Sequence, residues 1–140
     1  MKKYIGTKII HAEPAMKLNH PSDMYLQDGY KVVYPDGYES WSPKDVFEKA
    51  YRPTDGMTFG LAIEAMKNGL KVRRRGWNGK NQHIELASAI SYKNPEGTVV
   101  NAEHEAIGNQ AVAFCGTSGV QMGWLASQAD MLAEDWEIVE

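Results

Sequence analysis

The sequence predicts an α+β fold in two units, because stretches that alternate apolar and polar residues are interspersed with amphipathic helical stretches and turns containing Gly or Pro. Of its 140 residues, 43% are hydrophobic, which is enough for one core or two small ones. We interpret residues 54–56 as a linker between residues 1–53 and residues 57–140. We expect a small antiparallel sheet with a helix first. A helix on a twisted antiparallel sheet should follow, with a short helix inserted near the C-terminus.

The N-terminal unit begins with strand patterns. Residues 4–12 predict a first strand, and residues 29–41 predict a β-hairpin whose turn is closed by Gly37. Residues 13–28 contain two prolines and have little periodicity, so we expect a loop there. These patterns predict a small sheet of two or three strands.

A helix is expected after the hairpin. Ser42 is placed to cap it, Pro43 takes the first helical position, and Asp45 adds an acid to the first turn. Apolar residues recur at helical spacing up to Tyr51, and Pro53 stops the helix. Nothing in this unit indicates a function.

The second unit begins with another helical pattern. Thr58 is placed as its N-cap, and Gly69 ends it. One helical face is apolar and consists of Phe59, Ala62, Ile63 and Met66. Strand patterns follow at residues 70–74, 82–87, 98–100, 111–115 and 120–124. The turn at residues 116–119 closes the last two as a hairpin.

The C-terminal stretch places Trp124 and Trp136 around a short helix. Ser127 and Asp130 fit a capping box, so residues 128–133 should form little more than one turn, held by tertiary contacts. Trp136 begins an alternating strand and is expected to point into the core. Trp124 ends a strand and faces the N-terminus of the short helix, where unpaired N–H groups attract anions. We therefore interpret Trp124 as a stacking platform for a base.

Residues 71–80 form a basic run with five cations, Trp77 and an Asn-Gly turn, and no acid lies between Glu64 and Glu85. Guanidinium groups fit phosphate oxygens and aromatic faces stack on bases, so the run is typical of nucleotide recognition. A solvated basic strand with a structural Trp77 is an equally good interpretation.

The charges are distributed unevenly along the chain. All 15 Lys and Arg residues lie at or before Lys93, and residues 94–140 contain eight acids. A long nucleic acid would be repelled by that acidic part, so we do not expect it as a partner. A small anion in a local basic pocket is compatible with this distribution.

The sequence contains no secretory signal pattern and no apolar run of transmembrane length. We therefore expect a soluble protein in the cytoplasm of the cell, without a membrane partner. The lone Cys115 excludes an internal disulfide framework. Together with four scattered histidines, it argues against a structural zinc site.

Motifs of catalysis are incomplete. Residues 11–14 lack the paired cysteines that complete a zinc-deaminase site, and residues 116–119 lack the spacing of a nucleophile elbow. The polar run of Glu103, His104 and Glu105 could bind a metal or move a proton, but such runs are more often solvated. We expect binding without turnover, with no catalytic residue, metal or cofactor.

Several motifs together carry a family resemblance. They are residues 57–63, Val72 with its basic flank, residues 76–80 and, above all, residues 123–136. From about residue 57 to the end, the chain resembles the phage-encoded Thoeris anti-defence protein 2 family. The first 50-odd residues instead resemble a small module of unknown role that is found in phage proteins.

The resemblance implies a sponge that acts in the infected bacterial host. Members of that family are homotetramers that sequester glycocyclic ADP-ribose, the cyclic ADP-ribose isomer made by bacterial TIR-domain defence enzymes, without cleaving it. Some members also hold cyclic dinucleotides in a separate site. On this resemblance we expect a homo-oligomer, with a pocket between subunits and with ligand choice set by residues 88–110.

The resemblance also implies a role for individual residues. The expected stacking aromatics are Trp77 and Trp124, with Phe59 as a third wall. The expected polar contacts are Asn78, the phosphate-binding candidates Arg74 and Arg75, and Ser127 and Asp130 near the ribose or the base edge. Alternation places Arg73 and Arg75 on one strand face and Arg74 on the other. We therefore do not expect all three arginines to contact the same ligand.

Two other functions fit the same residues. One is an enzyme that cleaves this ligand, using Asp130 or the run at residues 103–105. The other is a phage module that binds a protein or a nucleic acid through the basic strand.

Overall fold

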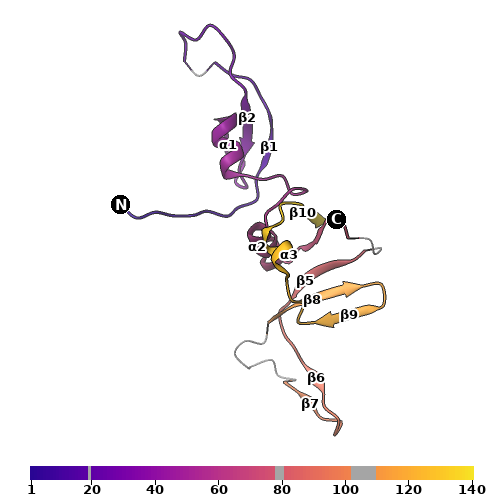
Figure 1. Ribbon diagram of the computed structural model, residues 1–140. Helices are drawn as coiled ribbons and strands as arrows, with labels where there is room; N and C mark the ends of the chain where they lie inside the picture. Colours follow the sequence, from indigo (N-terminus) through magenta and orange to yellow (C-terminus); the bar gives the residue numbers. More distant parts are fainter. Residues whose placement is uncertain (19, 78–80, 102–109) are drawn as a thin grey trace. The chain divides into compact units, whose positions relative to one another are not determined.

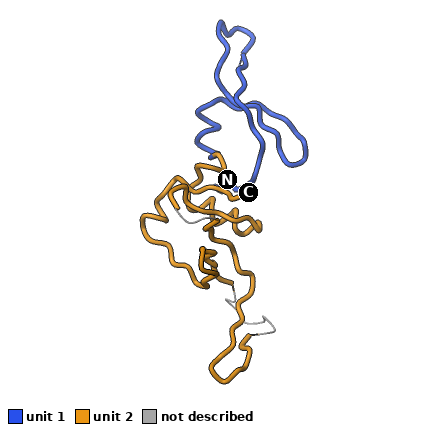
Figure 2. Tube along the Cα trace, turned by 90° about the vertical axis from the view of Figure 1, so that its right-hand side faces the viewer, with its two compact units in different colours: residues 1–52 blue, residues 53–140 orange. Residues whose placement is uncertain are grey.

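A computed structural model describes residues 1–18, 20–77, 81–101 and 110–140, and the chain divides into the units Met1–Arg52 and Pro53–Glu140 (Figures 1 and 2). Both units combine helix with antiparallel sheet, so the predicted α+β class is confirmed. Within the described ranges, no helix has the length and apolar character needed to cross a membrane.

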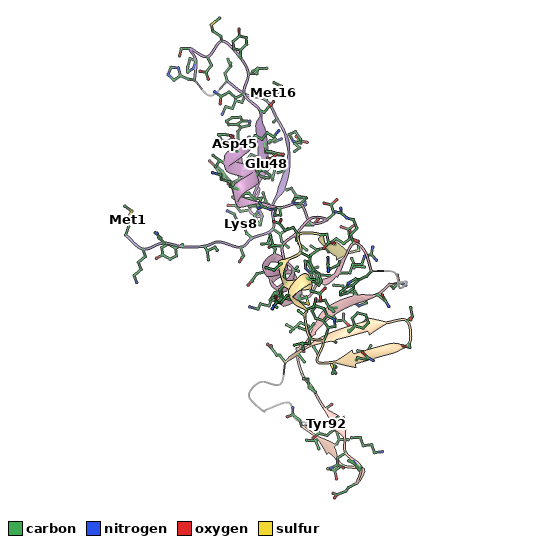
Figure 3. All side chains as sticks on the ribbon, viewed as in Figure 1. Met1, Lys8, Met16, Asp45, Glu48 and Tyr92 are labelled. Carbon is green, nitrogen blue, oxygen red and sulfur yellow. The ribbon has the colours of Figure 1, made fainter. Side chains whose placement is uncertain are left out.

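The first unit is a three-stranded sheet in the order β1-β2-β3, followed by one helix. Its elements are β1 (His11–Pro14), β2 (Gly29–Val33), β3 (Glu39–Pro43) and α1 (Lys44–Ala50). Val32 of the central strand is buried, and the ring of Tyr30 stacks on Phe47 of α1 at 4.0 Å between centroids. The hydroxyl of Tyr30 donates to Glu48, which is labelled on the helix in Figure 3. These contacts hold α1 on the sheet.

Three predictions for this unit were wrong in their boundaries. The first strand begins at His11 instead of residue 4, and the expected loop at residues 13–28 continues the β1–β2 pairing through a bridge between Lys17 and Gln27. Pro43, not Ser42, occupies the N-cap position of the helix, and it makes no side-chain capping hydrogen bond. Pro43 is still extended and lies opposite Gly29 in the sheet, so the helix begins at Lys44 and Ser42 falls one position before the N-cap.

The second unit is a five-stranded antiparallel sheet in the order β10-β4-β5-β8-β9 (Figure 1). Its strands are β4 (Lys71–Arg74), β5 (His83–Ala87), β8 (Ala111–Gly116), β9 (Gly119–Met122) and β10 (Trp136–Val139). Its helices are α2 (Phe59–Lys67) and α3 (Gln128–Leu132). A separate two-stranded sheet is formed by β6 (Tyr92–Lys93) and β7 (Val99–Val100), with Tyr92 labelled in Figure 3. The sequence patterns missed β6.

Helix α2 forms as its sequence predicts. Thr58 caps it by accepting a hydrogen bond from the N–H of Leu61, and Gly69 follows in the left-handed conformation that glycine tolerates. Its apolar face packs on β4, β5 and β10. The resulting core consists of Met57, Ala62, Ala65, Met66, Val72, Ile84 and Trp136.

The C-terminal strand fixes Trp136 in this core. β10 pairs with β4 so that Trp136 lies opposite Arg74, and Trp136 exchanges two backbone hydrogen bonds with Met57. The indole is fully buried, and its Nε1 donates to the carbonyl of Asp130 at 2.9 Å. The prediction that Trp136 points into the core is confirmed.

Candidate functional site

Five aromatic side chains of the second unit meet on one side of its sheet. This aromatic cluster consists of Phe59, Trp77, Phe114, Trp124 and Trp136. Within it, the Trp124 ring lies 6.1 Å from Trp136, 6.0 Å from Trp77 and 6.4 Å from Phe59 between centroids, each in edge-on geometry. Such edge-on pairs each stabilise by about 0.5–1.5 kcal/mol beyond their buried area. The cluster therefore holds Trp124 in a defined orientation.

The backbone after β9 positions Trp124. Gly123 adopts φ 80°, which turns the chain out of the strand, and the N–H groups of Gly123 and Trp124 both donate to the carbonyl of Val112. The residue is anchored through its main chain, and its side chain stays half-buried. Trp124 is therefore more accessible than Trp136, as the sequence predicted.

Trp124 and Phe59 line a pocket of about 180 Å³. The other lining residues are Ile63, Met66, Lys67, Leu86, Gln110, Val112 and Ala126. They come from α2, β5, β8 and the segments before β8 and α3. The lining is largely apolar, with one cation and one amide. Pockets for ligands of drug size usually have about 300–1,000 Å³, so this volume suits one ring system and not a whole nucleotide.

Trp77 lies behind Trp124 and does not line the pocket. Its ring contacts Phe114 and Trp136, each at 5.6 Å between centroids, in addition to Trp124. These are the contacts of a packing residue, which fits the alternative interpretation of Trp77 as structural. Its role as a stacking aromatic stays a prediction.

The Arg74 guanidinium is held by two carboxylates. Its Nε and Nη2 lie 3.0 and 3.4 Å from the two carboxylate oxygens of Asp135, and Nη1 lies 3.1 Å from Asp130. The side chain is 27% exposed. Its hydrogen bonds to Asp135, followed by the one to Asp130, raise the pKa of Arg74 despite its burial. A phosphate at this position would have to compete with both acids.

Ser127 and Asp130 form the predicted capping box of α3. The N–H of Asp130 donates to Ser127 Oγ at 3.1 Å, and the N–H of Ser127 donates to Asp130 Oδ2 at 3.0 Å. Burial opposes the charge of Asp130 most strongly, but hydrogen bonds from Ser127 and Arg74 outweigh it and lower the carboxyl pKa. Both side chains have structural partners within the unit, and their contact with a ligand stays a prediction.

Arg73 and Arg75 both approach Glu137, whereas Arg74 meets Asp130 and Asp135. Arg73 Nε lies 2.9 Å from Glu137 Oε1, and Arg75 Nε lies 4.0 Å from Oε2. Arg75 also donates to the carbonyl of Asp55, and its side chain is 62% exposed. The predicted alternation of the three arginines is confirmed.

These ion pairs join the basic run to acids of the C-terminal part of the chain. β4, which is rich in cations, lies beside β10 and its preceding turn, which supply the acids. Contacts between charges that lie far apart in the sequence thus neutralise much of the arginine run. Of the three arginines, Arg75 keeps the most accessible side chain.

Asn78 lies outside the described residues, as does the run of Glu103, His104 and Glu105. Sequence reasoning missed Lys67 and Gln110 as polar pocket residues. The spacing of Phe59, Ile63 and Met66 on one helical face already indicated the wall from α2. No comparable pattern marks the strand and loop residues on the opposite wall, because their approach depends on sheet pairing.

Comparison with known proteins gives matches to a family model and to a phage protein. Residues 57–139 match the family model of the Thoeris anti-defense 2-like domain, which covers more than half of the chain. The chain is also similar to Thoeris anti-defense 2 of Bacillus phage SP01, with 40% identity over 88 residues. That alignment covers 59% of this chain and 94% of the phage SP01 protein.

Proposed function

The chain belongs to the Thoeris anti-defense 2-like family, and from this membership we propose that it is a phage anti-defence sponge. It binds glycocyclic ADP-ribose, the signal made by TIR-domain defence enzymes, and keeps it from the defence effector. The observation that carries this proposal is the apolar pocket lined by Phe59 and Trp124, beside a cation and an amide.

The pocket offers stacking and little else to a ligand. An aromatic face contributes about 1–3 kcal/mol per stacked base, and the half-buried Trp124 lines the pocket beside Phe59. Since both side chains are already held by the aromatic cluster, binding would cost little side-chain entropy. A base of the cyclic nucleotide is therefore the part of the ligand that we place here.

Phosphate groups need cations near the pocket. Lys67 is at its edge, and its Nζ lies 3.6 Å from Glu64 in an exposed pair that contributes little stability. Arg75, which follows β4, is accessible but pairs with Glu137 and not with the carboxylates that hold Arg74. We therefore favour Lys67 as the first phosphate contact, with Arg74 available if its carboxylate partners move.

A second subunit would complete the pocket. Its volume of about 180 Å³ is below that of common ligand pockets, so one subunit encloses only part of a cyclic nucleotide. Large apolar side chains are exposed nearby: Leu125 is 89% exposed, and Leu132 is 80% exposed. Strand β9 also ends the sheet and exposes Val120 and Met122. Apolar surface and a sheet edge together favour self-association, for which we propose a homotetramer.

The pocket lining supports binding without turnover. Among the described lining residues, the ionisable or amide side chains are one lysine and one glutamine, and no carboxylate, imidazole or thiol lines the pocket. Hydrolysis of a glycosidic or phosphate linkage usually requires a general acid or base at hydrogen-bond distance. Asp130, the candidate of the enzyme hypothesis, is occupied by Arg74 and Ser127.

Recovery of the ligand from the complex tests this proposal. The purified full chain is mixed with glycocyclic ADP-ribose, separated from unbound ligand and heated, and the released compound is identified by mass spectrometry. Intact ligand in stoichiometric amount is the expected result. Hydrolysed ligand would establish an enzyme, and no retained ligand would contradict the proposed signal. Cyclic dinucleotides would then be the next ligands to test.

A further inference from the structure

Three potential metal ligands meet on the sheet of the second unit. His83 and Glu85 lie two residues apart on β5, so their side chains point to the same face. Cys115 of β8 lies directly opposite His83. One ligand atom from each side chain falls within 4.8 Å of the other two. Since Glu85 and Cys115 are 30 residues apart in sequence, residue spacing gave no sign of this group.

The distances suit a small cation. Cys115 Sγ lies 3.3 Å from Glu85 Oε1, and His83 Nε2 lies 3.9 Å from Glu85 Oε2. Ligand atoms around a tetrahedral Zn²⁺ are separated by about 3.5 Å, given metal–ligand bonds of about 2.0–2.3 Å. Small side-chain rotations would therefore bring all three atoms to coordination distance.

The imidazole of His83 is oriented for coordination. Its Nδ1 lies 2.7 Å from the carbonyl oxygen of Asn81, which can only accept a hydrogen bond. In the neutral imidazole this contact favours the ring proton on Nδ1, which leaves the lone pair on Nε2, the nitrogen nearer Glu85. Metal-binding histidines usually have such a hydrogen bond on the second nitrogen.

The cluster lies on the opposite sheet face from the aromatic pocket. Ile84, between His83 and Glu85, is fully buried in the core, and Phe114 opposite it contacts Trp77. Residues next to these in each strand point away from the core. A ligand of this cluster would therefore not occupy the pocket at Trp124.

Nearby charges both favour and oppose a cation at this cluster. Burial, followed by the hydrogen bond and charge of Glu85, raises the pKa of the Cys115 thiol, whereas Lys71 lowers it. A divalent cation would replace the thiol proton and balance the charges of the thiolate and Glu85. Lys71 opposes the cation, and Arg73 is already paired with Glu137.

We propose that His83, Glu85 and Cys115 bind a divalent transition metal, for which Zn²⁺ is the best match. Imidazole, carboxylate and thiolate together suit Zn²⁺, whereas Mg²⁺ and Ca²⁺ prefer oxygen ligands only. Three protein ligands leave a fourth position for water. The metal would join β5 to β8 and is independent of the proposed sponge activity.

Cobalt binding tests the proposal on the metal-free full chain. Because Cys115 is the only cysteine, a near-ultraviolet thiolate-to-cobalt absorption band on titration with Co²⁺ reports on this site alone. We expect the band to appear and to disappear on addition of Zn²⁺. Absence of the band would overturn the proposal.

Three variants distinguish a site with three protein ligands from metal binding by the thiol alone. Cys115→Ser should abolish the band, and His83→Ala and Glu85→Gln should each weaken Co²⁺ binding by at least about 10-fold, the lower limit for loss of a second-shell partner. His20→Ala, an exposed imidazole in the first unit, is the matched control and should leave binding unchanged. Equal binding by the wild type, His83→Ala and Glu85→Gln would overturn the proposal, whereas Trp124→Ala should retain the metal.

Discussion

The first unit buries Val32 as its one large apolar side chain, whereas the second buries eight hydrophobic residues, counted over the described residues. The first unit instead relies on half-buried rings, with Tyr30, Phe47 and Tyr51 stacked in series. The second has a core large enough to bury Trp136 and to hold Trp124 half-buried beside it. The core of the second unit therefore gives Trp124 the rigid support that a binding side chain needs.

The largest effect is expected from Trp136→Ala. The substitution removes a fully buried indole, three ring contacts and the hydrogen bond to Asp130. Its loss should lower the free energy of unfolding of the second unit by about 3–5 kcal/mol. Urea titration followed by NMR of individual amides would measure it. A loss spread equally over residues 1–52 and 53–140 would contradict the separate cores.

The corresponding change in the first unit is Val32→Ala. It removes two buried methyl groups from the central strand, so the free energy of unfolding of residues 1–52 should fall by about 2 kcal/mol. Val46→Ala, at an exposed position of α1, is the matched control and should change it by less than about 0.5 kcal/mol. Equal effects of the two substitutions would show that Val32 is not the core of this unit.

A smaller effect is expected from Ser127→Ala, which removes the cap of α3. Helix caps of this type contribute about 1 kcal/mol, and the thermal midpoint of the second unit should fall accordingly. Ser118→Ala, in the exposed turn between β8 and β9, should leave the midpoint unchanged. If both variants melt alike, the capping box does not stabilise the unit.

The smallest expected effect is the change in stability at acid pH that depends on Asp130. Because folding lowers the pKa of Asp130, its charge stabilises the second unit above the ordinary carboxyl pKa. That contribution is lost as the pH falls through the lowered pKa of the folded state. Asp130→Asn should therefore reduce stability near neutral pH and flatten its decline below a pH of about 4. Parallel acid unfolding curves for variant and wild type would contradict this assignment.

Local signals in the sequence predicted much of the fold. The Thr58 cap, the apolar face of α2 and the capping box at Ser127 each depend on neighbours within a few residues, and the structure confirms them. The alternation that placed Trp136 in the core is also a local pattern, and the burial of Trp136 confirms it. Ser42 was wrong as a cap because β3 continues through Pro43, which pairs with Gly29, and the helix therefore begins one residue later.

The site was less predictable than the fold because it depends on contacts between strands that lie far apart in the sequence. The basic run suggested arginines that are free to bind phosphate. In the fold, however, Asp135 pairs with Arg74 and Glu137 pairs with Arg73, each from more than 60 positions away. The grouping of His83 with Cys115 likewise depends on the pairing of β5 with β8. Residue types along the chain therefore indicated an aromatic and basic site, and sheet register decided which side chains remain available.

Calorimetric titration with glycocyclic ADP-ribose tests the central claim most directly, using the wild type and Trp124→Ala. We predict that the wild type binds and that the variant, folded by circular dichroism, binds about 5- to 150-fold more weakly, as expected for a lost stacking contact of about 1–3 kcal/mol. Equal affinity of the two proteins would contradict the assignment of the pocket at Trp124.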